Sequence, residues 1–428
     1  MKKIKQIIKT IWAKGALHIF MGSFLNKFVA FFGSIVIVRL LSKTEYGMLG
    51  YAENLYNFAY IIAGFGVSNA ILRYVVLEDS IEEKKNVFLF SSRFAFKFNI
   101  ILVVLLGIIN TFYPHTSEFE ACRIYIYIMI LSLPFQYYTD NSLSLERAMF
   151  NNKKYALLAF MTSAMIIVGK LLGASINGLM GVIVLGVIIN IILAYSMLQV
   201  SEKKYFIGNS KYFLEKNKKK KILSYSFQYM LTNGIWTLFM LIDVFMLGKI
   251  ADNSSIIADY KVAYAWPANI SIICSAIGVF IAPYFIKNEK NPDWIRLNYK
   301  RTFLISFFLV CSVGLVMILL AKPLIFIYGG SLYYNVIPVM QVLTIGSIIN
   351  NGLRYTTANI FAAMGKIKYN MFVSALGIIV QSVLNLYMIP RFGMYGPAFS
   401  GIINYSLMAI ILFVCFAKTN DLFGQKKP

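Results

Sequence analysis

The sequence predicts an all-α integral membrane protein of about 12 transmembrane helices, arranged as two six-helix bundles. Three observations point to this fold class. The chain of 428 residues is 59% hydrophobic and 14% charged, which is more apolar surface than a water-soluble domain buries. The apolar residues come in repeated runs of about 20, the length of a membrane-crossing helix. A basic polar stretch near the middle separates six such runs from six more.

The first element is an amphipathic helix over residues 1–14. It carries five lysines, and its apolar residues (Ile4, Ile7, Ile8, Ile11 and Trp12) recur three and four positions apart. This stripe predicts a helix that lies on an anionic membrane surface. We interpret the spanning helix that follows as a permanent part of the protein, because no cleavable signal peptide is recognisable.

Twelve spanning helices follow in two sets. In the first half we expect them over 16–41, 45–76, 86–110, 121–149, 154–174 and 179–200. In the second half we expect them over 222–249, 256–287, 298–321, 333–363, 368–389 and 395–417. The predicted domains are therefore an N-terminal bundle at 1–200, a basic cytoplasmic linker at 201–221 and a C-terminal bundle at 222–428. The linker holds eight lysines and is expected to be a solvated loop.

Backbone breaks are expected inside four of these helices. Pro134, Pro267 and Pro338 each remove a helical hydrogen bond, and Gly64-Phe65-Gly66 interrupts the second helix. Such breaks are tolerated at membrane depth where the backbone is buried in protein or lines a cavity. An ordinary kinked helix explains them equally well.

The net charge of +23 is explained by topology. Most lysines and arginines fall in alternate connections between apolar runs, which places both termini and the linker in the cytoplasm. The pattern gives no reason to expect nucleic acid as a partner. The connections on the other side are short, so no extracytoplasmic domain is expected.

The two halves of the chain are related by one recurring offset, which is about half the length of the chain. Ala148-Met149 recurs as Ala363-Met364, and Gly178, Gly181 and Gly186 recur as Gly393, Gly396 and Gly401. Glu45-Tyr46 recurs as Asp259-Tyr260, within one position of the same offset. Several matches at one offset indicate an internal duplication, with the copies related by an axis along the membrane normal.

Ionisable residues inside the apolar runs are the candidate site, because each costs at least about 2.5–3.5 kcal/mol at the bilayer centre. The cations are Lys27, Arg93, Lys97, Lys170 and Arg354, and the acids are Glu53, Asp140 and Asp243. An excess of cations suits an anionic cargo such as a pyrophosphate. Snorkelling explains Lys170 or Arg93 as well, and the acids are equally suited to charge pairing or to ion coupling.

No catalytic or metal-binding constellation is recognisable. The chain has two histidines, His18 and His115, and its four cysteines are widely spaced in or beside apolar runs. There is no phosphate-binding loop, so no enzyme, cofactor or metal is expected. A membrane-embedded glycosyltransferase or polymerase would usually place a catalytic carboxylate in a large outside loop, which is lacking here.

Two segments resemble the N-terminal signature of polysaccharide-biosynthesis flippases. They are Arg39-Leu40-Leu41-Ser42-Lys43-Thr44-Glu45-Tyr46-Gly47 and Gly64-Phe65-Gly66-Val67-Ser68-Asn69-Ala70-Ile71-Leu72-Arg73-Tyr74. The resemblance implies the Wzx-type branch of the multidrug/oligosaccharidyl-lipid/polysaccharide (MOP) exporter superfamily, with its MATE-like twelve-helix plan. The related lipid II flippases usually have two additional helices, which this chain lacks.

The resemblance further implies a multi-pass protein of the bacterial cytoplasmic (inner) membrane. Such a protein moves undecaprenyl-pyrophosphate-linked oligosaccharide units by alternating access, for O-antigen of lipopolysaccharide, capsule or a related polymer. H⁺ or Na⁺ is the expected coupling ion, and polysaccharide polymerase and chain-length proteins are candidate partners. The alternative is an ion-coupled exporter of small cationic compounds, which the excess of cations disfavours.

Overall fold

The computed structural model describes residues 16–202, 205 and 213–420, and within them the regular structure is helical. The predicted amphipathic helix at 1–14 lies outside these residues, as does most of the segment 203–212 of the predicted linker. The described chain forms two compact units, and the division between them falls inside one long helix, between Gly234 and Ile235. The predicted division into 1–200, 201–221 and 222–428 concerns the order of membrane spans and stays a prediction.

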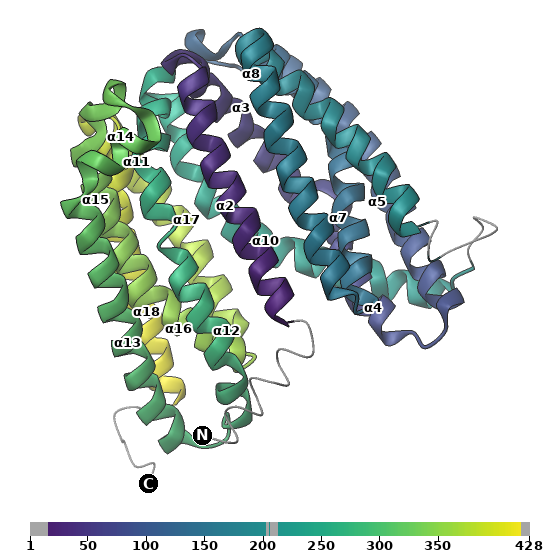
Figure 1. Cartoon of the computed structure of the whole chain (residues 1–428). Coiled ribbons are helices and arrows are strands. Elements are labelled where there is room, and N and C mark those ends of the chain that lie inside the picture. The colour runs from purple at the N-terminus through teal and green to yellow at the C-terminus, as the bar shows by residue number, and fades with distance from the viewer. Residues whose placement is uncertain (1–15, 203–204, 206–212, 421–428) are drawn as a thin grey trace. The chain divides into compact units, whose positions relative to one another are not determined.

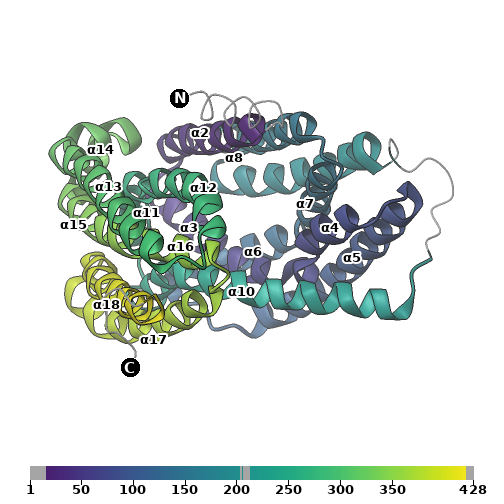
Figure 2. The ribbon, with the colours of Figure 1, turned by 90° about the horizontal axis from the view of Figure 1, so that it is seen from below.

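Unit 1 contains seven α-helices before the shared helix within the described residues. They are α2 (Ala16–Leu40), α3 (Lys43–Ile62), α4 (Val67–Leu77), α5 (Ile81–Phe112), α6 (Cys122–Ile130), α7 (Leu133–Ala148) and α8 (Asn152–Met197). α2 runs alongside α8, and α4, α5 and α7 pack against one another (Figures 1 and 2). The shared helix α10 (Lys216–Ile250) then leads into unit 2.

Unit 2 repeats this plan with more interruptions. Its α-helices are α11 (Ser254–Ala268), α12 (Ser271–Lys287), α13 (Pro292–Leu319), α14 (Ala321–Gly329), α15 (Ile337–Ile348), α16 (Thr356–Ala363), α17 (Ile367–Phe392) and α18 (Tyr395–Thr419). α14 lies where we expected a plain connection, and the short helical turn η4 (Ser331–Val336) spans the end of that connection and the start of the helix expected over 333–363. The π-helical turn η5 (Ile349–Tyr355) joins α15 to α16.

Nine helical runs in the described part of the chain are long and apolar enough to cross a membrane. One of them contains α8, whose 46 residues would extend about 69 Å as a straight helix, about twice the hydrocarbon thickness. The helix breaks at Asn177 and Gly178, between the two spans predicted at 154–174 and 179–200. The protein is thus a multi-pass helical membrane protein, and the full count of twelve spans, their grouping into two six-helix bundles and the cytoplasmic termini stay predictions.

All four expected backbone breaks lie at or next to the end of a helical element. A tight turn with three left-handed residues, Gly64 to Gly66, separates α3 from α4. α6 ends just before Pro134, which lies in the first turn of α7, and α11 ends just after Pro267. Pro338 lies in the first turn of α15, directly after the short helical turn η4, just as Pro134 lies in the first turn of α7. A proline in a first turn lacks no hydrogen bond, so both residues mark a helix start. The π-helical turn η5 is a second interruption of that span, which was not expected.

Small residues let the two halves of α8 pack as an antiparallel hairpin. A Cβ atom on Gly181 would lie 2.0 Å from the carbonyl oxygen of Gly173, so the two backbones are in direct contact. Such close approach is how small residues join helices in a membrane. The turn itself is held by Glu45 of α3, whose carboxylate accepts a hydrogen bond from the backbone N–H of Leu179 (3.2 Å). The same carboxylate completes a capping box with Ser42 at the start of α3.

The internal duplication is visible in the backbone. Gly178 (φ 50°, ψ −135°) and Gly393 (φ 54°, ψ −126°) share an unusual conformation, and the difference between their positions is the repeat offset. Phe150 (φ 56°) and Gly365 (φ 69°), separated by the same offset, are both left-handed after a helix end. Gly396, the counterpart of Gly181, likewise packs against backbone, with a Cβ position 2.7 Å from the nitrogen of Ile389.

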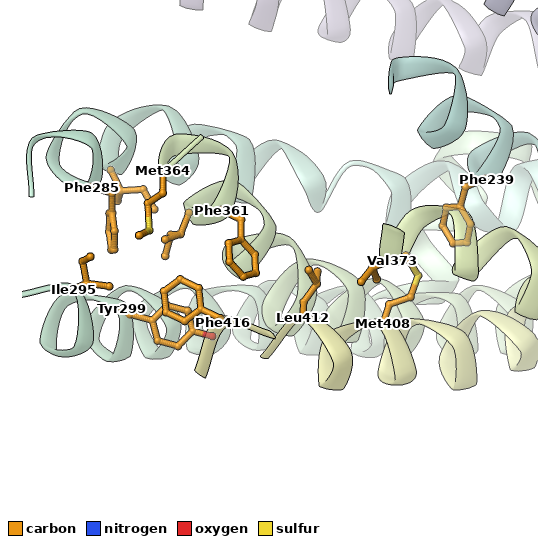
Figure 3. Close-up of a cluster of buried hydrophobic side chains, with 12 residues drawn as sticks. Phe239, Phe285, Ile295, Tyr299, Phe361, Met364, Val373, Met408, Leu412 and Phe416 are labelled. Carbon is orange, nitrogen blue, oxygen red and sulfur yellow. The ribbon is translucent and has the colours of Figure 1, made fainter. Parts of the chain in front are cut away.

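The core of unit 2 is an aromatic and aliphatic cluster between α10, α12, α13, α16, α17 and α18 (Figure 3). Tyr299 and Phe416 stack with their ring centroids 4.1 Å apart, and Phe361 meets Phe416 edge-on at 5.2 Å. Burial of such rings fixes the rotation of each helix about its axis. The polar faces of α17 and α18 are thereby directed to a defined place in the unit.

The lysines at 216–221 differ from our expectation of a loop, because they form the first turns of α10. Lysine is a good helix former, and here two of these side chains find partners. Lys218 pairs with Glu78 (Nζ–Oε2 2.5 Å), and the ammonium of Lys219 lies 5.7 Å from the ring centroid of Phe90. These contacts attach the start of α10 to unit 1.

Candidate functional site

Arg93 and Lys97 lie together at a groove in unit 1. Both are exposed, one turn apart on α5, and the other walls of the groove come from α7 and the second half of α8. The groove has a volume of about 500 Å³ and is mostly apolar. Its lining includes Leu89, Phe96, Phe135, Ile191 and Leu198 beside the hydroxyls of Ser92, Tyr138 and Tyr195. A groove of this kind is matched to an amphiphile with an anionic head and an apolar chain.

Lys170 pairs with Glu53 inside a second cavity of unit 1. The Lys170 ammonium donates to Oε1 of Glu53 at 2.7 Å, and both side chains are 27% exposed. The cavity has a volume of about 310 Å³ and is lined from α3, α6, α7 and both halves of α8. Tyr56, on its wall, donates to Oε1 of Gln136 (2.6 Å) and is hydrogen-bonded to Ser132. The predicted charge pairing of Glu53 is therefore present in the structure.

Asp140 lies on α7 close to this network but outside the cavity lining. The hydroxyl of Tyr60 donates to its carboxylate. Tyr60 also stacks on Tyr56, with centroids 6.1 Å apart, so Asp140 is connected through two rings to the Glu53 cavity. No ion pair is formed by Asp140 among the described residues, which leaves its negative charge without a cationic partner there.

Lys27 and the other cations do not form one cluster within either unit, as far as the described residues show. Lys27 is exposed on α2 and lines neither of the two cavities of unit 1. Arg354 belongs to unit 2. The structure thus brings together Arg93 with Lys97, and Lys170 with Glu53. A single cationic cleft that contains all five cations stays a prediction.

Asp243 is the acid of a small polar cavity in unit 2. Its carboxylate accepts hydrogen bonds from the side-chain amides of Gln381 (2.8 Å) and Asn385 (2.8 Å) and from the Tyr260 hydroxyl (3.0 Å). The cavity beside it has a volume of about 50 Å³ and is lined also by Tyr264, Ser347 and Tyr405. Among the residues that the structure describes, no cationic side chain lines this cavity.

Two buried amide oxygens next to Asp243 have no hydrogen-bond donor in the described structure. They are Oδ1 of Asn385 and Oδ1 of Asn404, and the Asn404 amide donates in turn to Gln381 (3.0 Å). Buried polar atoms are normally satisfied, and a site for an ion is one explanation of an exception. A carboxylate with nearby amide and hydroxyl oxygens is a donor set suited to a small hard cation.

Arg354 is buried (3% exposed) in the π-helical turn η5. Its Nε donates to Oδ1 of Asn350 (2.7 Å), and its guanidinium lies 4.4 Å from the ring centroid of Trp236. In the described part of the chain it forms no ion pair. The π turn widens the helix by one residue and is a feature often found at functional sites. A stacked guanidinium without a carboxylate partner keeps its donors available for an anion.

Several residues of these sites were missed from the sequence. Gln381, Asn385 and Asn404 are uncharged, and a search for ionisable residues passes over them. A signal was present, because Gln381 and Asn385 are four residues apart in an apolar helix and therefore share one face. Tyr60 and Trp236 carried no such signal among the many aromatic residues of the chain.

A sequence model of the family described as "Polysaccharide biosynthesis protein" matches residues 12–289. A solved structure of the lipid II flippase MurJ in an inward closed conformation is 15% identical, with a TM-score of 0.74, and the match covers 95% of this chain and 89% of MurJ. An inward-facing multidrug resistance MATE family transporter of the MOP superfamily is 14% identical, with a TM-score of 0.69 and coverage of 94% and 96%.

A third similar structure is a MOP superfamily transporter from Pyrococcus furiosus, reported with a reversed polarity of its binding pocket. It is 14% identical, with a TM-score of 0.62 and coverage of 96% of both chains. No curated protein matches the sequence. At these identities the structural similarity establishes the fold alone, while the sequence model spans more than half of the chain. The resemblance noted from Arg39 to Tyr74 is confirmed: the chain belongs to the polysaccharide biosynthesis protein family and has the fold of the MOP superfamily transporters.

Proposed function

We propose that the protein is a flippase for undecaprenyl-pyrophosphate-linked oligosaccharide units in the bacterial cytoplasmic membrane. It works by ion-coupled alternating access, and its cargo feeds O-antigen, capsule or a related surface polysaccharide, together with a polymerase and chain-length proteins. Membership of the polysaccharide biosynthesis family supports the substrate class. The MOP transporter fold supports transport rather than catalysis.

The observation that carries the proposal is the groove at Arg93 and Lys97. A polyprenyl-pyrophosphate combines an apolar chain with a compact anionic group, and the groove combines an apolar wall with two cations on one helical face. Arginine binds a phosphate in bidentate fashion, and lysine binds it as a point charge. The groove is where we place the first contact with the pyrophosphate end of the lipid.

Lys27 and Arg354 complete the proposed cationic path for the head group. Arg354, stacked on Trp236 and bonded to Asn350, is held in position to receive an anion. Lys27 is exposed on its helix and is available for transient contact. Lys170 contributes to this path less directly, because Glu53 already neutralises its charge.

Asp243 is the carboxylate that we assign to ion coupling. It accepts three hydrogen bonds from neutral groups and has no cationic partner among the described residues. A buried negative charge of this kind favours uptake of H⁺ or Na⁺. Glu53 is less suited because Lys170 occupies it, and Asp140 is a second candidate because Tyr60 is its neutral partner.

The alternative, an exporter of small cationic compounds, needs an acidic pocket of sufficient size. Pockets for drug-sized ligands occupy about 300–1,000 Å³. The Asp243 cavity has about 50 Å³, while the larger groove of about 500 Å³ presents cations rather than acids. The Glu53 cavity of about 310 Å³ is large enough, but Lys170 neutralises its acid. The geometry therefore favours an anionic cargo and a monatomic coupling ion.

The test is lipid translocation in proteoliposomes. Purified wild-type protein is compared with an R93Q/K97Q variant, using a fluorescent undecaprenyl-pyrophosphoryl oligosaccharide. A K300Q/R301Q variant is the matched control, because it removes two exposed cations from the first half of α13 in unit 2. We expect the wild type and the control to move the lipid, and the R93Q/K97Q rate to fall by about 10-fold or more, since each lost charged contact contributes about 1.5–3 kcal/mol.

Two outcomes would contradict the proposal. Wild-type protein that is inert towards this lipid but expels an organic cation at the expense of an ion gradient would establish the exporter instead. Equal losses in R93Q/K97Q and K300Q/R301Q would show a general effect of surface charge, and the groove would lose its assigned role.

A further inference from the structure

The Glu53 cavity of unit 1 and the Asp243 cavity of unit 2 occupy equivalent places in the two repeats. Five residues that line the first have counterparts, at the repeat offset, that line the second. The pairs are Ser132 and Ser347, Val182 and Pro397, Ile183 and Ala398, Gly186 and Gly401, and Asn190 and Tyr405. The shared backbone turns at Gly178 and Gly393 show that the same helical hairpin encloses both. The two cavities are therefore two versions of one ancestral site.

The same helix position supplies a hydrogen-bond donor to the carboxylate in each cavity. In unit 1 the donor is the Lys170 ammonium, 2.7 Å from Oε1 of Glu53. In unit 2 it is the Asn385 amide, 2.8 Å from Oδ1 of Asp243, and Asn385 is the counterpart of Lys170 at the repeat offset. The carboxylates themselves come from different helices, α3 and α10. Both repeats therefore have a hydrogen-bond donor at this position, but the donor is charged in unit 1 and neutral in unit 2.

This difference sets the charge of each cavity. The described lining of the unit 1 cavity contains one acid and one base, Glu53 and Lys170, and is neutral. The described lining of the unit 2 cavity contains one acid and no base. A carboxylate in a low-dielectric interior is costly unless a cation or a proton neutralises its charge. Unit 1 supplies a cation from its own chain, whereas the described lining of the unit 2 cavity leaves this role to an ion from solution.

We propose that Lys170 is a tethered replacement for a cation, and that it closes the unit 1 cavity to ions while the unit 2 cavity binds one Na⁺ at Asp243. This inference rests on the proposed ion coupling at Asp243. The two repeats then differ in ion binding because of the side chain at one equivalent position. This side chain carries an ammonium at position 170 and an amide at position 385. Loss of the ammonium would expose Glu53 and the oxygens of Ser132, Gln136 and Asn190 to a cation, since all four line the cavity.

The test is ²²Na⁺ equilibrium binding to the purified full-length protein in detergent, without lipid substrate. We expect one Na⁺ per wild-type chain and none in D243N. Lys170→Asn, which copies the residue found at position 385, is expected to raise the number from one to two. K170N/E53Q is expected to return to one, because the additional ion depends on the Glu53 carboxylate.

The converse variant tests the inference independently, should K170N fold poorly. Asn385→Lys places an ammonium beside Asp243 and is expected to abolish Na⁺ binding while the protein stays monodisperse. The inference is overturned if K170N and K170N/E53Q bind the same number of ions, if N385K still binds Na⁺, or if the wild type binds none or two. The flippase proposal is judged separately: lipid translocation by a wild type without Na⁺ binding would overturn this inference and leave the flippase in place.

Discussion

The two units share a backbone plan but differ in the charge that they place on the corresponding helix. Position 140 in α7 of unit 1 corresponds, at the repeat offset, to Tyr355 in the π turn η5, next to Arg354. Unit 1 therefore has a carboxylate bound to Tyr60 where unit 2 has a guanidinium stacked on Trp236. The glycine turns and close helix contacts were retained in both copies, because the fold requires them. The charged side chains diverged, in keeping with the roles that we propose for them in binding the cargo and the ion.

The largest loss of stability is expected from substitutions that disrupt the close backbone contacts shared by the two units. Gly181→Val and Gly396→Val would each drive a side chain into backbone, at 2.0 Å and 2.7 Å respectively. We expect each to cost about 3 kcal/mol or more, enough to prevent recovery of folded protein. Gly186→Ala is the control, since no atom lies within 4 Å of its Cβ position. Yield of monodisperse protein is the measurement, and a harmless G396V beside a damaging G181V would show that the two hairpins are built differently.

The second prediction concerns the guanidinium of Arg354, which unit 2 has close to the position where unit 1 has the Asp140 carboxylate. Arg354→Lys keeps the charge but loses the planar stack on Trp236 and the Nε hydrogen bond to Asn350. We expect the lipid translocation rate to fall about 10-fold, which corresponds to about 1.4 kcal/mol. Trp236→Phe, which retains a ring for the cation, is expected to lose less. An R354K variant with the wild-type rate would reduce Arg354 to a simple point charge.

The third prediction concerns the Glu53–Lys170 pair. Glu53→Gln leaves a partly buried ammonium without its partner, and we expect a loss of about 1–2 kcal/mol of stability, less than for a fully buried pair because both side chains are 27% exposed. The double variant E53Q/K170M should recover most of the loss. Thermal melts of the single and double variants measure the coupling. Additive effects of the two substitutions would show that the pair contributes no interaction energy.

The smallest effect is expected at the exposed pair of Glu120 and Arg123. The hydrogen bond from Arg123 (2.8 Å) holds the pKa of Glu120 below its usual value. A depressed carboxyl pKa adds stability that is present above the ordinary carboxyl pKa and is lost as the pH falls through the lowered pKa. Since the carboxyl is exposed, Glu120→Gln should leave the melting temperature at neutral pH unchanged within error. A clear decrease would mean that this connection contributes more to the fold than a surface pair does.

The breaks and repeats of the chain were predictable because they depend on local chemistry. Proline and glycine act on the backbone where they stand, so Pro134, Pro267 and Gly64 to Gly66 mark real interruptions. Pro134 and Pro338 both lie in the first turn of a helix, so each marks a helix start and not a hydrogen bond lost inside a helix. The start of α10 was placed too late, since a lysine run is compatible with both loop and helix, and contacts with Glu78 and Phe90 select the helix.

The sequence by itself determined the membrane class, the apolar runs, the family signature and the duplication, because composition and spacing carry them. It also identified Lys170, Glu53 and Asp243 as ionisable residues inside apolar runs, where a charge is costly. Only the tertiary structure decided that Lys170 neutralises Glu53, 117 positions away, while Asp243 is bound by Gln381 and Asn385, over 130 positions away. The physical reason is that a charged residue in an apolar helix gives the same sequence pattern whichever neighbouring helix its side chain faces. Its partner is set by the rotation and packing of helices that lie far apart in the chain.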